Sequence, residues 1–367
     1  AVLLSLQVPG QAQPEFDYPT EVVYNEAEEI YYVSNWADGE GNVLTMNTSG
    51  EITGTLFSDL SYAGGMCLIN DVLYVTDYGD LYGGTLPSYL VDIDINSGDE
   101  LFRNEINSGG TYLDLIDTDN NGNIFICDSE KQCIYKYNIP AQTHETMVTG
   151  INKPLGICYD YIEDRVLFTQ SKSAGSLIKS VSPEGGDVTN VLWHPGWIEG
   201  IIMNDEGEYF MSSWTGNGVD WGNEPVYKLN HLLNGWKYEL TNDQNRPFGM
   251  CLGHNNFLVI CNWGSHVVNF FDLTPYGTDE AMAQEETLNV YPNPGNGYLK
   301  VTVPAHLSNH ARLTVLDMSS RTVSEMVLQN AGGQQEIPLD LTFLPAGIYV
   351  LVVQDGNTLY REKLVIQ

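Results

Sequence analysis

Short apolar runs recur along most of the chain, and they come in pairs that a polar turn separates. In the clearest pair, a Pro-x-Gly turn leads into residues 250–252 (MCL), and the run 257–261 (FLVIC) follows after two asparagines. Two such runs predict an antiparallel hairpin with both strands well buried. The second run ends in a polar and an aromatic residue, Asn262 and Trp263, and five more hairpins follow the same plan.

The six copies of this hairpin occupy residues 19–36, 63–78, 113–129, 154–171, 198–214 and 247–263. Aligned on the Pro-x-Gly glycine, the copies have these residues at one position: Glu21, Gly65, Asp114, Gly156, Gly200 and Gly249. The third copy needs an extra turn residue, so Asp114 could be misaligned by one residue. A third apolar run follows each hairpin, as at 134–137 and 226–229, and a fourth usually follows, as at 53–57. Four short strands in a period of about 40–50 residues are typical of a β-propeller. The sequence therefore predicts an all-β fold with six blades over residues 18–275.

The N-terminal segment, residues 1–17, has two interpretations. The sixth copy has only three apolar runs and ends with 267–273, so residues 2–8 (VLLSLQV) could supply its fourth strand and close the ring. The same segment also matches the end of a secretory signal peptide, with Gly10-x-Ala12 as the cleavage signal. Both interpretations are open.

The pattern changes after Pro275. Residues 276–287 (YGTDEAMAQEET) are acidic and rich in small residues, which predicts a linker. Residues 288–367 then contain about seven short alternating runs, at 288–290, 299–303, 312–316, 325–328, 335–339, 348–353 and 359–366. This spacing predicts a small Ig-like β-sandwich.

The charge of the chain limits the classes of partner. The sequence has 48 acidic and 15 basic residues, with a formal net charge of −33. A surface this acidic argues against nucleic acid and anionic lipid. It fits an acidic protein outside the cell, or simply a charge that keeps the protein soluble. No apolar run is long enough to predict a transmembrane helix.

The six cysteines recur at equivalent places. Cys67, Cys158 and Cys251 share one site in the first strand of alternate copies, and Cys127 and Cys261 share a site in the second strand. Such repetition favours small buried filler over disulfides. The pair Cys127 and Cys133 alone faces across a turn, and its disulfide state is open.

Three phrases of the repeat carry a resemblance to known propellers: NGNIFICDS at 121–129, EGEYFMSSW at 206–214 and RPFGMCL at 246–252. Residues 18–275 resemble the NHL family and the related gluconolactonase (senescence-marker) family. These motifs are specific for the fold and say little about function.

The tail closely resembles the C-terminal sorting domain of the bacterial type IX secretion system. The resemblance rests on YPNP at 291–294, on LPAGIY at 344–349 and on a lysine in the last strand, while MSSR at 318–321 departs from the usual glycine turn. The implied sorting-signal residues are Pro292, Asn293, Pro294, Gly347 and Lys363. The resemblance implies a Bacteroidetes-type bacterium, passage through the periplasm to the outside or the outer surface, and cleavage of the tail. The implied partners are translocon and sortase components.

Ligand-binding residues are expected at one end of the propeller channel. First strands start there and second strands end there, and the long connections 78–88 and 214–225 lie at the same end. The candidates are Trp36, Tyr78, Trp214, Trp221, Trp263, Asn35 and Asn262. The aromatic residues could stack on a glycan or hold a peptide, and packing between blades explains them equally well.

Glu21 and Glu199 are the candidate metal ligands. In gluconolactonase-like propellers a Glu, an Asn and an Asp hold a divalent cation, and the resemblance puts Glu21 near the first and Glu199 at the last. The Asn position falls at Leu155, which puts the site in doubt. Backbone oxygens and water could complete a calcium shell. Asp117-x-Asp119-x-Asn121-Gly122 also imitates the start of a calcium loop, but a turn between strands explains it better.

Two functions follow. The preferred one is a secreted, non-catalytic recognition propeller that binds glycan, peptide or protein at the channel mouth. The alternative is a metal-dependent lactonase or ester hydrolase, in which Glu199 would act as metal ligand or general base. The missing Asn ligand favours the first.

Overall fold

The structure is a computed structural model. It describes residues 15–367 except 80–84, 110, 172–174, 215–223, 230–232, 234–236, 274–287, 304–310, 318–321, 329–334 and 356–357. The predicted strand at 2–8, Trp221 and the predicted linker therefore lie outside the described residues. The chain forms two compact units, Ala1–Thr274 and Pro275–Gln367.

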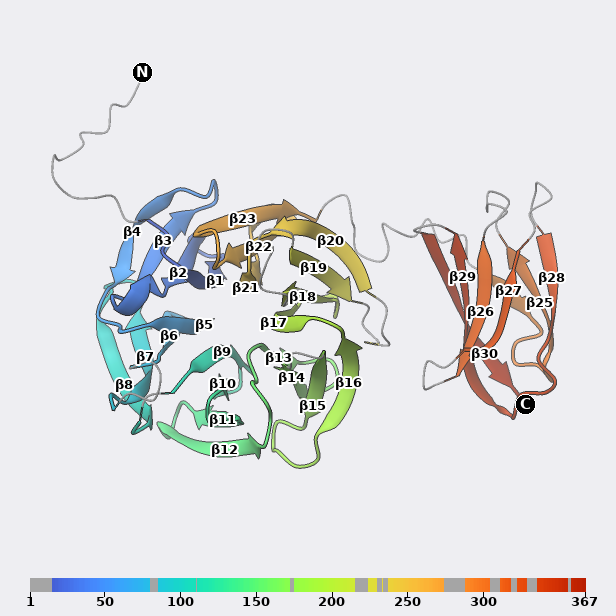
Figure 1. Ribbon diagram of the computed structural model, residues 1–367, viewed down its shortest axis with the longest axis horizontal. Helices are drawn as coiled ribbons and strands as arrows, with labels where there is room; N and C mark the ends of the chain where they lie inside the picture. Colours follow the sequence, from blue (N-terminus) through green and yellow to red (C-terminus); the bar gives the residue numbers. More distant parts are fainter. Residues whose placement is uncertain are drawn as a thin grey trace, which may run out of the picture. The chain divides into compact units, whose positions relative to one another are not determined.

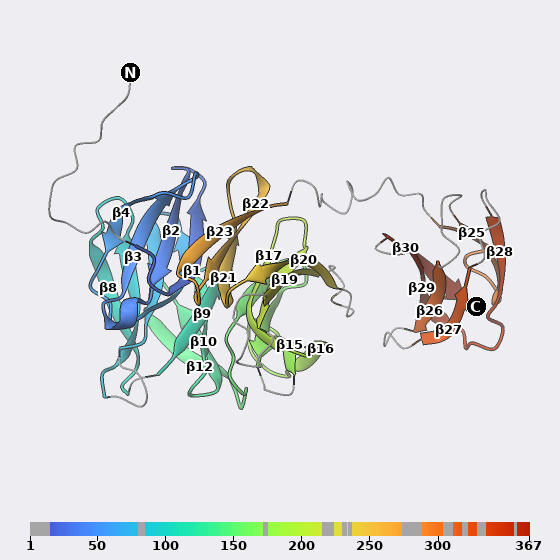
Figure 2. The same cartoon turned by 45° about the horizontal axis from the view of Figure 1, so that its top comes forward.

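The first unit is a ring of six antiparallel sheets, or blades, whose first strands lie nearest the centre (Figures 1 and 2). Blades 1 and 2 contain β1 (Pro19–Asn25), β2 (Ile30–Asn35), β3 (Asn42–Asn47), β4 (Ile52–Phe57), β5 (Ala63–Ile69), β6 (Val72–Asp77), β7 (Ser88–Asp94) and β8 (Glu100–Asn107). Blades 3 and 4 contain β9 (Leu113–Thr118), β10 (Asn123–Asp128), β11 (Cys133–Asn138), β12 (Thr143–Thr149), β13 (Ile157–Asp160), β14 (Arg165–Gln170), β15 (Ser176–Val181) and β16 (Thr189–His194). Blade 5 contains β17 (Trp197–Met203), β18 (Tyr209–Trp214), β19 (Glu224–Leu229) and β20 (Lys237–Gln244), and blade 6 contains β21 (Pro247–Leu252), β22 (Phe257–Asn262) and β23 (Val267–Asp272). The predicted six-bladed propeller is confirmed.

Two short 3-10 turns, η1 (Ala37–Gly39) and η2 (His254–Asn256), are the helical elements among the described residues. No helix in the described part of the chain is long and apolar enough to cross a membrane.

Apolar side chains from facing blades form the core. One cluster joins blades 1 and 2 around Tyr32, Leu73 and Val91, and another joins blades 3 and 4 around Phe125 and Phe168. A further cluster closes the ring, because Val22 and Tyr31 of blade 1 pack with Val259 and Cys261 of blade 6. Each fully buried large side chain contributes about 1.5–3 kcal/mol. Blade 6 has three strands among the described residues, so β23 is its outer strand, and Val267 is 39% exposed.

A β-bulge near the start of the first strand recurs in most blades. The pairing of first and second strands shifts between Pro19 and Val22, Ala63 and Met66, Ile198 and Ile201, and Pro247 and Met250. In blade 3 the shift lies between Leu113 and Ile116. We number the two bulge residues 1 and 2, so that Glu199 is position 1 and Gly200 is position 2 in blade 5. Asp114 then occupies position 1, and Leu115, not Asp114, stands where other blades have glycine.

Position 2 is where adjacent blades approach most closely. A Cβ at Gly65, Gly156, Gly200 or Gly249 would lie 2.4–2.6 Å from a main-chain oxygen of the next blade, namely that of Asp114, Glu199, Phe248 or Thr20. Real Cβ atoms essentially never come this close to other atoms, so the glycines allow the first strands to touch. Small polar side chains of the second strands strengthen the contact. Ser34, Thr76 and Ser212 donate to the carbonyl oxygens of Gly64, Asp114 and Phe248 at 2.6, 3.3 and 2.7 Å.

The six cysteines are all free. In the second strand of blade 3, Cys127 stands where Ser34, Thr76 and Ser212 stand in other blades, and its Sγ lies 3.8 Å from the Gly156 oxygen. Cys261 has the equivalent place in blade 6. Cys127 pairs with Ile134, whereas Cys133 pairs with Asp128. Because successive side chains of a strand point to opposite faces, Cys127 and Cys133 lie on opposite faces of blade 3. The disulfide left open by the sequence is therefore excluded in this structure.

The second unit consists of two antiparallel sheets, as expected for the predicted sandwich. They contain β24 (Asn289–Tyr291), β25 (Tyr298–Val303), β26 (Arg312–Asp317), β27 (Thr322–Val327), β28 (Gln335–Asp340), β29 (Gly347–Asp355) and β30 (Thr358–Ile366), in the orders β24-β25-β28 and β27-β26-β29-β30. The motif at 291–294 is tied to the last strand, since the Val365 N–H donates to the Asn293 side chain at 2.9 Å. Tyr349 of the second motif donates to the Pro345 oxygen at 2.9 Å. These motifs thus fix turns of the domain.

The close approach at position 2 predicts that added volume there separates two blades. Gly156→Ala should lower the free energy of unfolding by about 1–3 kcal/mol, because the new methyl group meets the main chain of blade 5. Gly109→Ala is the matched control, since nothing lies within 4 Å of a Cβ at that position. Urea unfolding of both variants gives the comparison. Equal stability of the two would contradict a close-packed ring.

Candidate functional site

We call the end of the channel at which the first strands begin the mouth. Two acidic residues, Asp114 of blade 3 and Glu199 of blade 5, occupy bulge position 1 there, with Leu155 of blade 4 at the corresponding place between them. Both carboxyl side chains are almost fully buried, at 4% and 2% exposure. The fold thus brings together one residue that the sequence singled out, Glu199, and one that it treated only as a repeat position, Asp114.

Asp114 carries an incompletely satisfied carboxyl group. Tyr78 donates its hydroxyl to Oδ1 at 3.4 Å, while Oδ2 is buried without a hydrogen-bond partner among the described groups. The pKa of Asp114 is raised to about 8, mainly by burial and in part by the charge of Asp128, while nearby Ser129 offsets some of the rise. A carboxyl group in this state is neutral at neutral pH and can donate a hydrogen bond.

Glu199 has a similar environment with basic residues added. Burial raises the pKa of Glu199 to about 8, and the charge of Asp114 acts in the same direction. Arg246 and Lys153 act against this rise, and Glu224 reinforces it. Because the effect of burial is larger than that of the basic residues, the mouth keeps two protonated acids beside two cations.

Half-buried aromatic rings surround Arg246. Its guanidinium lies 4.8 Å from the ring centre of Trp214 and 4.9 Å from that of Trp263. The ring centre of Trp263 lies 5.8 Å from that of Trp36 and 4.5 Å from that of Tyr18. We call this set, Trp214, Arg246, Trp263, Tyr18 and Trp36, the aromatic arc. It follows the mouth from blade 5 through blade 6 to blade 1.

The other candidates at the mouth are used within the fold. The Asn35 side chain accepts from the Asp17 N–H at 2.7 Å, and Asn262 accepts from the Asn245 N–H at 2.8 Å. Both residues therefore fix the segment that leads into the first strand of their own blade. Tyr78 is 4% exposed and bonds Asp114. Trp36, Trp214 and Trp263 keep part of their surface open, and Trp214 also donates to the Pro247 oxygen at 3.0 Å.

Glu21 points away from the mouth. It occupies bulge position 2, one residue further along its strand than the position of Glu199. Its Oε1 accepts from the Val22 N–H at 3.1 Å, and a Cβ on Gly249 would lie 2.3 Å from that oxygen. Burial raises the pKa of Glu21 well above its usual value, and the charge of Asp117 adds to the rise. The structure therefore does not bring Glu21 and Glu199 together.

The described residues contain no group of three or more His, Cys, Asp or Glu side chains close enough to hold a metal ion. In the loop that imitates a calcium site, Asp119 accepts from the N–H groups of Asn121 and Asn123 at 2.8 and 3.0 Å. Asp117 accepts from the Tyr159 N–H at 2.7 Å. These bonds belong to the turn between β9 and β10 and to the contact with blade 4.

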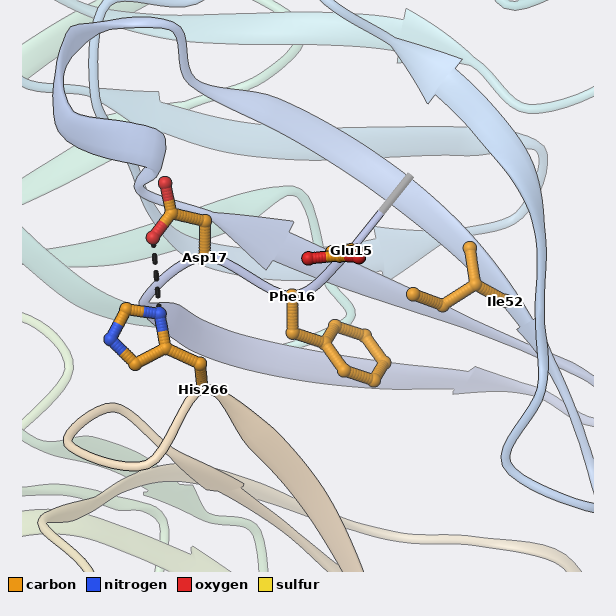
Figure 3. Close-up of a pocket in the computed structure, with 5 residues that line it drawn as sticks. All are labelled: Glu15, Phe16, Asp17, Ile52 and His266. Carbon is orange, nitrogen blue, oxygen red and sulfur yellow. Dashed lines mark ion pairs between the residues drawn. The ribbon is translucent and has the colours of Figure 1, made fainter. Parts of the chain in front are cut away.

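Two of the hollows that the described residues line lie elsewhere on the propeller. One, of about 780 Å³, lies between blades 1 and 6 and is lined by Glu15, Phe16, Asp17, Ile52 and His266. Figure 3 shows Asp17 and His266 turned toward each other, at 3.1 Å between Oδ1 and Nδ1, so this hollow sits beside a contact that joins the first and last blades. The other, of about 830 Å³, lies at the opposite end of the channel from the mouth and includes Glu21.

Sequence reasoning missed Arg246, Lys153 and Asp114 as residues of the mouth. Arg246 directly precedes the Pro-x-Gly turn of blade 6, and Lys153 directly precedes the same turn position of blade 4. A basic residue just before a turn that faces the channel was the available sign. For Asp114, the sign was a carboxyl group at a repeat position that is glycine in four of the six copies.

Comparison with known proteins agrees with both parts of the chain. Residues 289–367 match the family described as the secretion system C-terminal sorting domain. No curated protein sequence matches the chain significantly. A gluconolactonase from Xanthomonas campestris has a TM-score of 0.54 and 14% identity, over 69% of this chain and 85% of that chain. Regucalcin from Agrobacterium tumefaciens, described as a calcium-binding protein, has a TM-score of 0.50 and 12% identity, over 67% and 82%.

A hydrazine synthase from Kuenenia stuttgartiensis aligns equally well, with a TM-score of 0.53 and 12% identity, over 75% of this chain and 84% of that chain. Proteins of such different chemistry share this architecture, so the likeness shows the fold alone. The sorting domain implies secretion or attachment to the outer surface. The chain is thus an exported six-bladed β-propeller with the fold of the gluconolactonase and regucalcin structures, followed by a type IX secretion sorting domain.

Proposed function

We propose that the propeller is a secreted, non-catalytic recognition domain that binds a glycan at the mouth. The aromatic arc carries the proposal. It presents half-buried tryptophan and tyrosine rings along one side of the channel opening, next to the carboxyl groups of Asp114 and Glu199. Binding sites of this kind combine apolar and aromatic walls with a few convergent polar groups.

The chemistry of the mouth suits a neutral, hydroxyl-rich ligand. Aromatic faces offer large apolar area to the C–H faces of sugar rings, and protonated carboxyl groups both donate and accept hydrogen bonds. Arg246 and Lys153 add donors for hydroxyl oxygens. A peptide or a protein surface is the other ligand class that the arc could serve, and it is an outcome of the test below.

A second candidate function is a metal-dependent lactonase or ester hydrolase. The observation that favours it is that Asp114 and Glu199 both occupy bulge position 1 at the mouth. Oδ2 of Asp114 has no hydrogen-bond partner among the described groups and could serve as a ligand atom. In such an enzyme these carboxylates would hold the cation, which polarises a carbonyl group. Calcium takes six to eight oxygen ligands, and Glu21 is turned away, so the side chains present supply few of them. We therefore rank this candidate second.

The two candidates differ in which substitution matters. If the ligand is a glycan, Trp214→Ala should weaken binding about tenfold by removing a stacking surface, and Glu199→Gln should have little effect. If the ligand is a cation, Glu199→Gln should abolish most of the calcium affinity because a charged oxygen ligand is lost. Calorimetry with a glycan panel, a peptide library and calcium measures both.

Trp193→Ala is the matched control for this experiment, because Trp193 is 59% exposed on β16, the outer strand of blade 4. Circular dichroism should show that all three variants keep the fold. If neither Trp214→Ala nor Glu199→Gln changes a binding that the parent protein shows, the ligand binds elsewhere and the assignment to the mouth is wrong.

The buried acids of the mouth also predict a pH dependence of stability. Their pKa values are raised in the folded state, so between about pH 4 and pH 8 the folded protein holds protons that the unfolded chain has lost. The free energy of unfolding should thus fall as pH rises through this window. One pKa unit corresponds to about 1.4 kcal/mol, so a loss of at least about 2 kcal/mol is expected across the window.

Glu199→Gln should remove part of this slope, since the amide stays neutral. The variant should equal the parent at about pH 5 and exceed its stability at about pH 9. Asp99→Asn, at an exposed turn of blade 2, is the control and should leave the slope unchanged. A parent protein that becomes more stable toward pH 9 would contradict the environment described for these acids.

The sorting domain makes a prediction about export. A chain that ends at residue 276 should stay in the periplasm of a host with this secretion system, because the exporter recognises the tail. An unrelated periplasmic protein that carries residues 277–367 should instead reach the outside. Cell fractionation with immunoblotting measures both, and normal surface delivery of the shortened chain would contradict the role of the tail.

A further inference from the structure

Every blade places two equivalent residues at the mouth, one where its first strand begins and one where its second strand ends. The carbonyl oxygen of the first accepts from the N–H of the second at 3.1–3.2 Å in five blades, and in blade 5 the two residues are paired in the ladder. We call them entry and exit residues. In the order of the blades, the entry residues are Tyr18, Tyr62, Tyr112, Lys153, Trp197 and Arg246, and the exit residues are Trp36, Tyr78, Ser129, Ser171, Trp214 and Trp263.

At four of the six junctions between blades, the entry residue packs on the exit ring of the preceding blade. We call each of these contacts a clasp. The first three are Tyr18 on Trp263, Tyr62 on Trp36 and Tyr112 on Tyr78, at 4.5, 4.8 and 5.5 Å between ring centres. The fourth is the guanidinium of Arg246 on the ring of Trp214. The clasps join blades 5, 6, 1, 2 and 3 at the mouth, so they include most of the aromatic arc.

The two junctions of blade 4 have no clasp among the described residues. Their exit residues are Ser129 and Ser171, which have no ring on which an entry residue could pack. The entry residues of blades 4 and 5 contact each other instead, since Nζ of Lys153 lies 5.3 Å from the ring centre of Trp197. The Ser171 hydroxyl donates to the Ile198 oxygen at 2.8 Å, so it fixes the beginning of the first strand of blade 5.

The two buried acids of the mouth stand on either side of blade 4. Asp114 belongs to β9 and Glu199 to β17, and β13 of blade 4 packs against both of these strands (Figure 1). Oδ2 of Asp114 has no hydrogen-bond partner among the described groups, although the residue is only 4% exposed. The same part of the mouth thus holds the buried carboxyl groups and the junctions that no ring closes. We call it the unclasped sector, which consists of Asp114, Ser129, Lys153, Ser171, Trp197 and Glu199.

Lys153 is the exposed cation of the unclasped sector. The chain has 48 acidic residues, yet among the described residues the Lys153 side chain contacts the Trp197 ring and makes no ion pair. Arg246, in contrast, is half-buried between two tryptophan rings. Together with Arg246, Lys153 opposes the rise that burial causes in the pKa of Glu199. The ammonium of Lys153 is therefore close to the buried acids and still offers its donors to a bound molecule.

We infer that the unclasped sector is the specificity subsite of the mouth, an inference that rests on the glycan-binding function proposed above. One sugar unit binds there, with its hydroxyl groups between the Lys153 ammonium and the Asp114 carboxyl group, and the units that follow lie along the aromatic arc. Trp197 is a positioning residue, because its ring holds the Lys153 side chain. Stacking on the arc tolerates many sugars, whereas hydrogen bonds in the unclasped sector depend on where each hydroxyl group points.

The test is calorimetry of the full chain with maltohexaose, cellohexaose, laminarihexaose and mannohexaose. Selectivity is measured as the ratio of the two highest affinities. Lys153→Met keeps the length of the side chain and removes its donors. It should weaken binding of the preferred hexasaccharide about tenfold and lower the ratio by a similar factor, since the other sugars lack that hydrogen bond. Trp214→Ala should instead weaken binding of every hexasaccharide and keep the ratio, because it removes a stacking surface.

The positioning role of Trp197 has its own readout. Trp197→Ala should reproduce the effect of Lys153→Met, and Trp197→Phe should restore most of the selectivity because it keeps a ring against the ammonium. The double variant Lys153→Met/Trp197→Ala should lose no more than Lys153→Met alone, since both changes remove the same contact. Urea unfolding should show that each variant keeps the fold.

Lys179→Met is the matched control. Lys179 lies on β15, the third strand of blade 4, and donates to the Asn190 side chain at 2.8 Å. Because it belongs to the same blade but not to the mouth, its replacement should leave both the affinities and their ratio unchanged.

The results separate this inference from the proposed function. If Lys153→Met keeps the ratio while Trp214→Ala still weakens binding, the glycan site stands and the unclasped sector takes no part in selection. Equal affinity of the parent protein for all four hexasaccharides would also contradict a specificity subsite. If no hexasaccharide binds, the proposed function fails and this inference fails with it. Losses from Lys153→Met and Trp197→Ala that add fully in the double variant would show that Trp197 does not act through Lys153.

Discussion

The contact on which the ring depends is the approach of each first strand to the next at bulge position 2. In four blades a glycine allows a main-chain oxygen of the neighbouring blade to come within 2.4–2.6 Å of where a Cβ would be. Hydroxyl groups from the second strands donate to carbonyl oxygens at the same level. The first strands are therefore held by main-chain contact, and the apolar clusters farther out fill the wedge between diverging blades.

The same bulge decides which way the functional side chains point. Position 1 directs Asp114 and Glu199 toward the mouth, and position 2 places Glu21 at the hollow of the opposite end of the channel. Two carboxyl groups that are neighbours in the repeat pattern therefore serve opposite ends of the channel. An acidic protein with few bases can thus present two distinct environments. One has protonated acids beside aromatic rings and two cations, and the other has acids without any base among the described lining residues.

The sequence was sufficient for the architecture because strands and turns are set locally. Apolar runs such as 257–261 and 348–353 coincide with β22 and β29, and the motifs at 291–294 and 344–349 mark the sorting domain that the family match confirms. The sites were harder because they depend on a shift of one residue. No pattern in the neighbouring sequence shows that the bulge gives Asp114 the same position in its blade as Glu199 has in blade 5. The sequence also does not show that Cys133 faces away from Cys127. Arg246 belongs to the mouth only because blades 5 and 6 bring Trp214 and Trp263 to its two sides.

The free thiols have a consequence for the route that the protein takes. An exported chain passes through an oxidising compartment, where cysteines that can meet become linked. Here five of the six are buried in separate blades or on separate faces, and Cys251 is half-buried in the channel. Cys251 and Cys261 lie on the same face of blade 6, and both are free thiols in the fold. The folded propeller thus contains no disulfide on which its stability depends. Folding before oxidation is what protects it, because an unfolded chain with six thiols could cross-link wrongly. The contacts that close the ring therefore also bury five of the six thiols, so they shield them from the oxidant of that compartment.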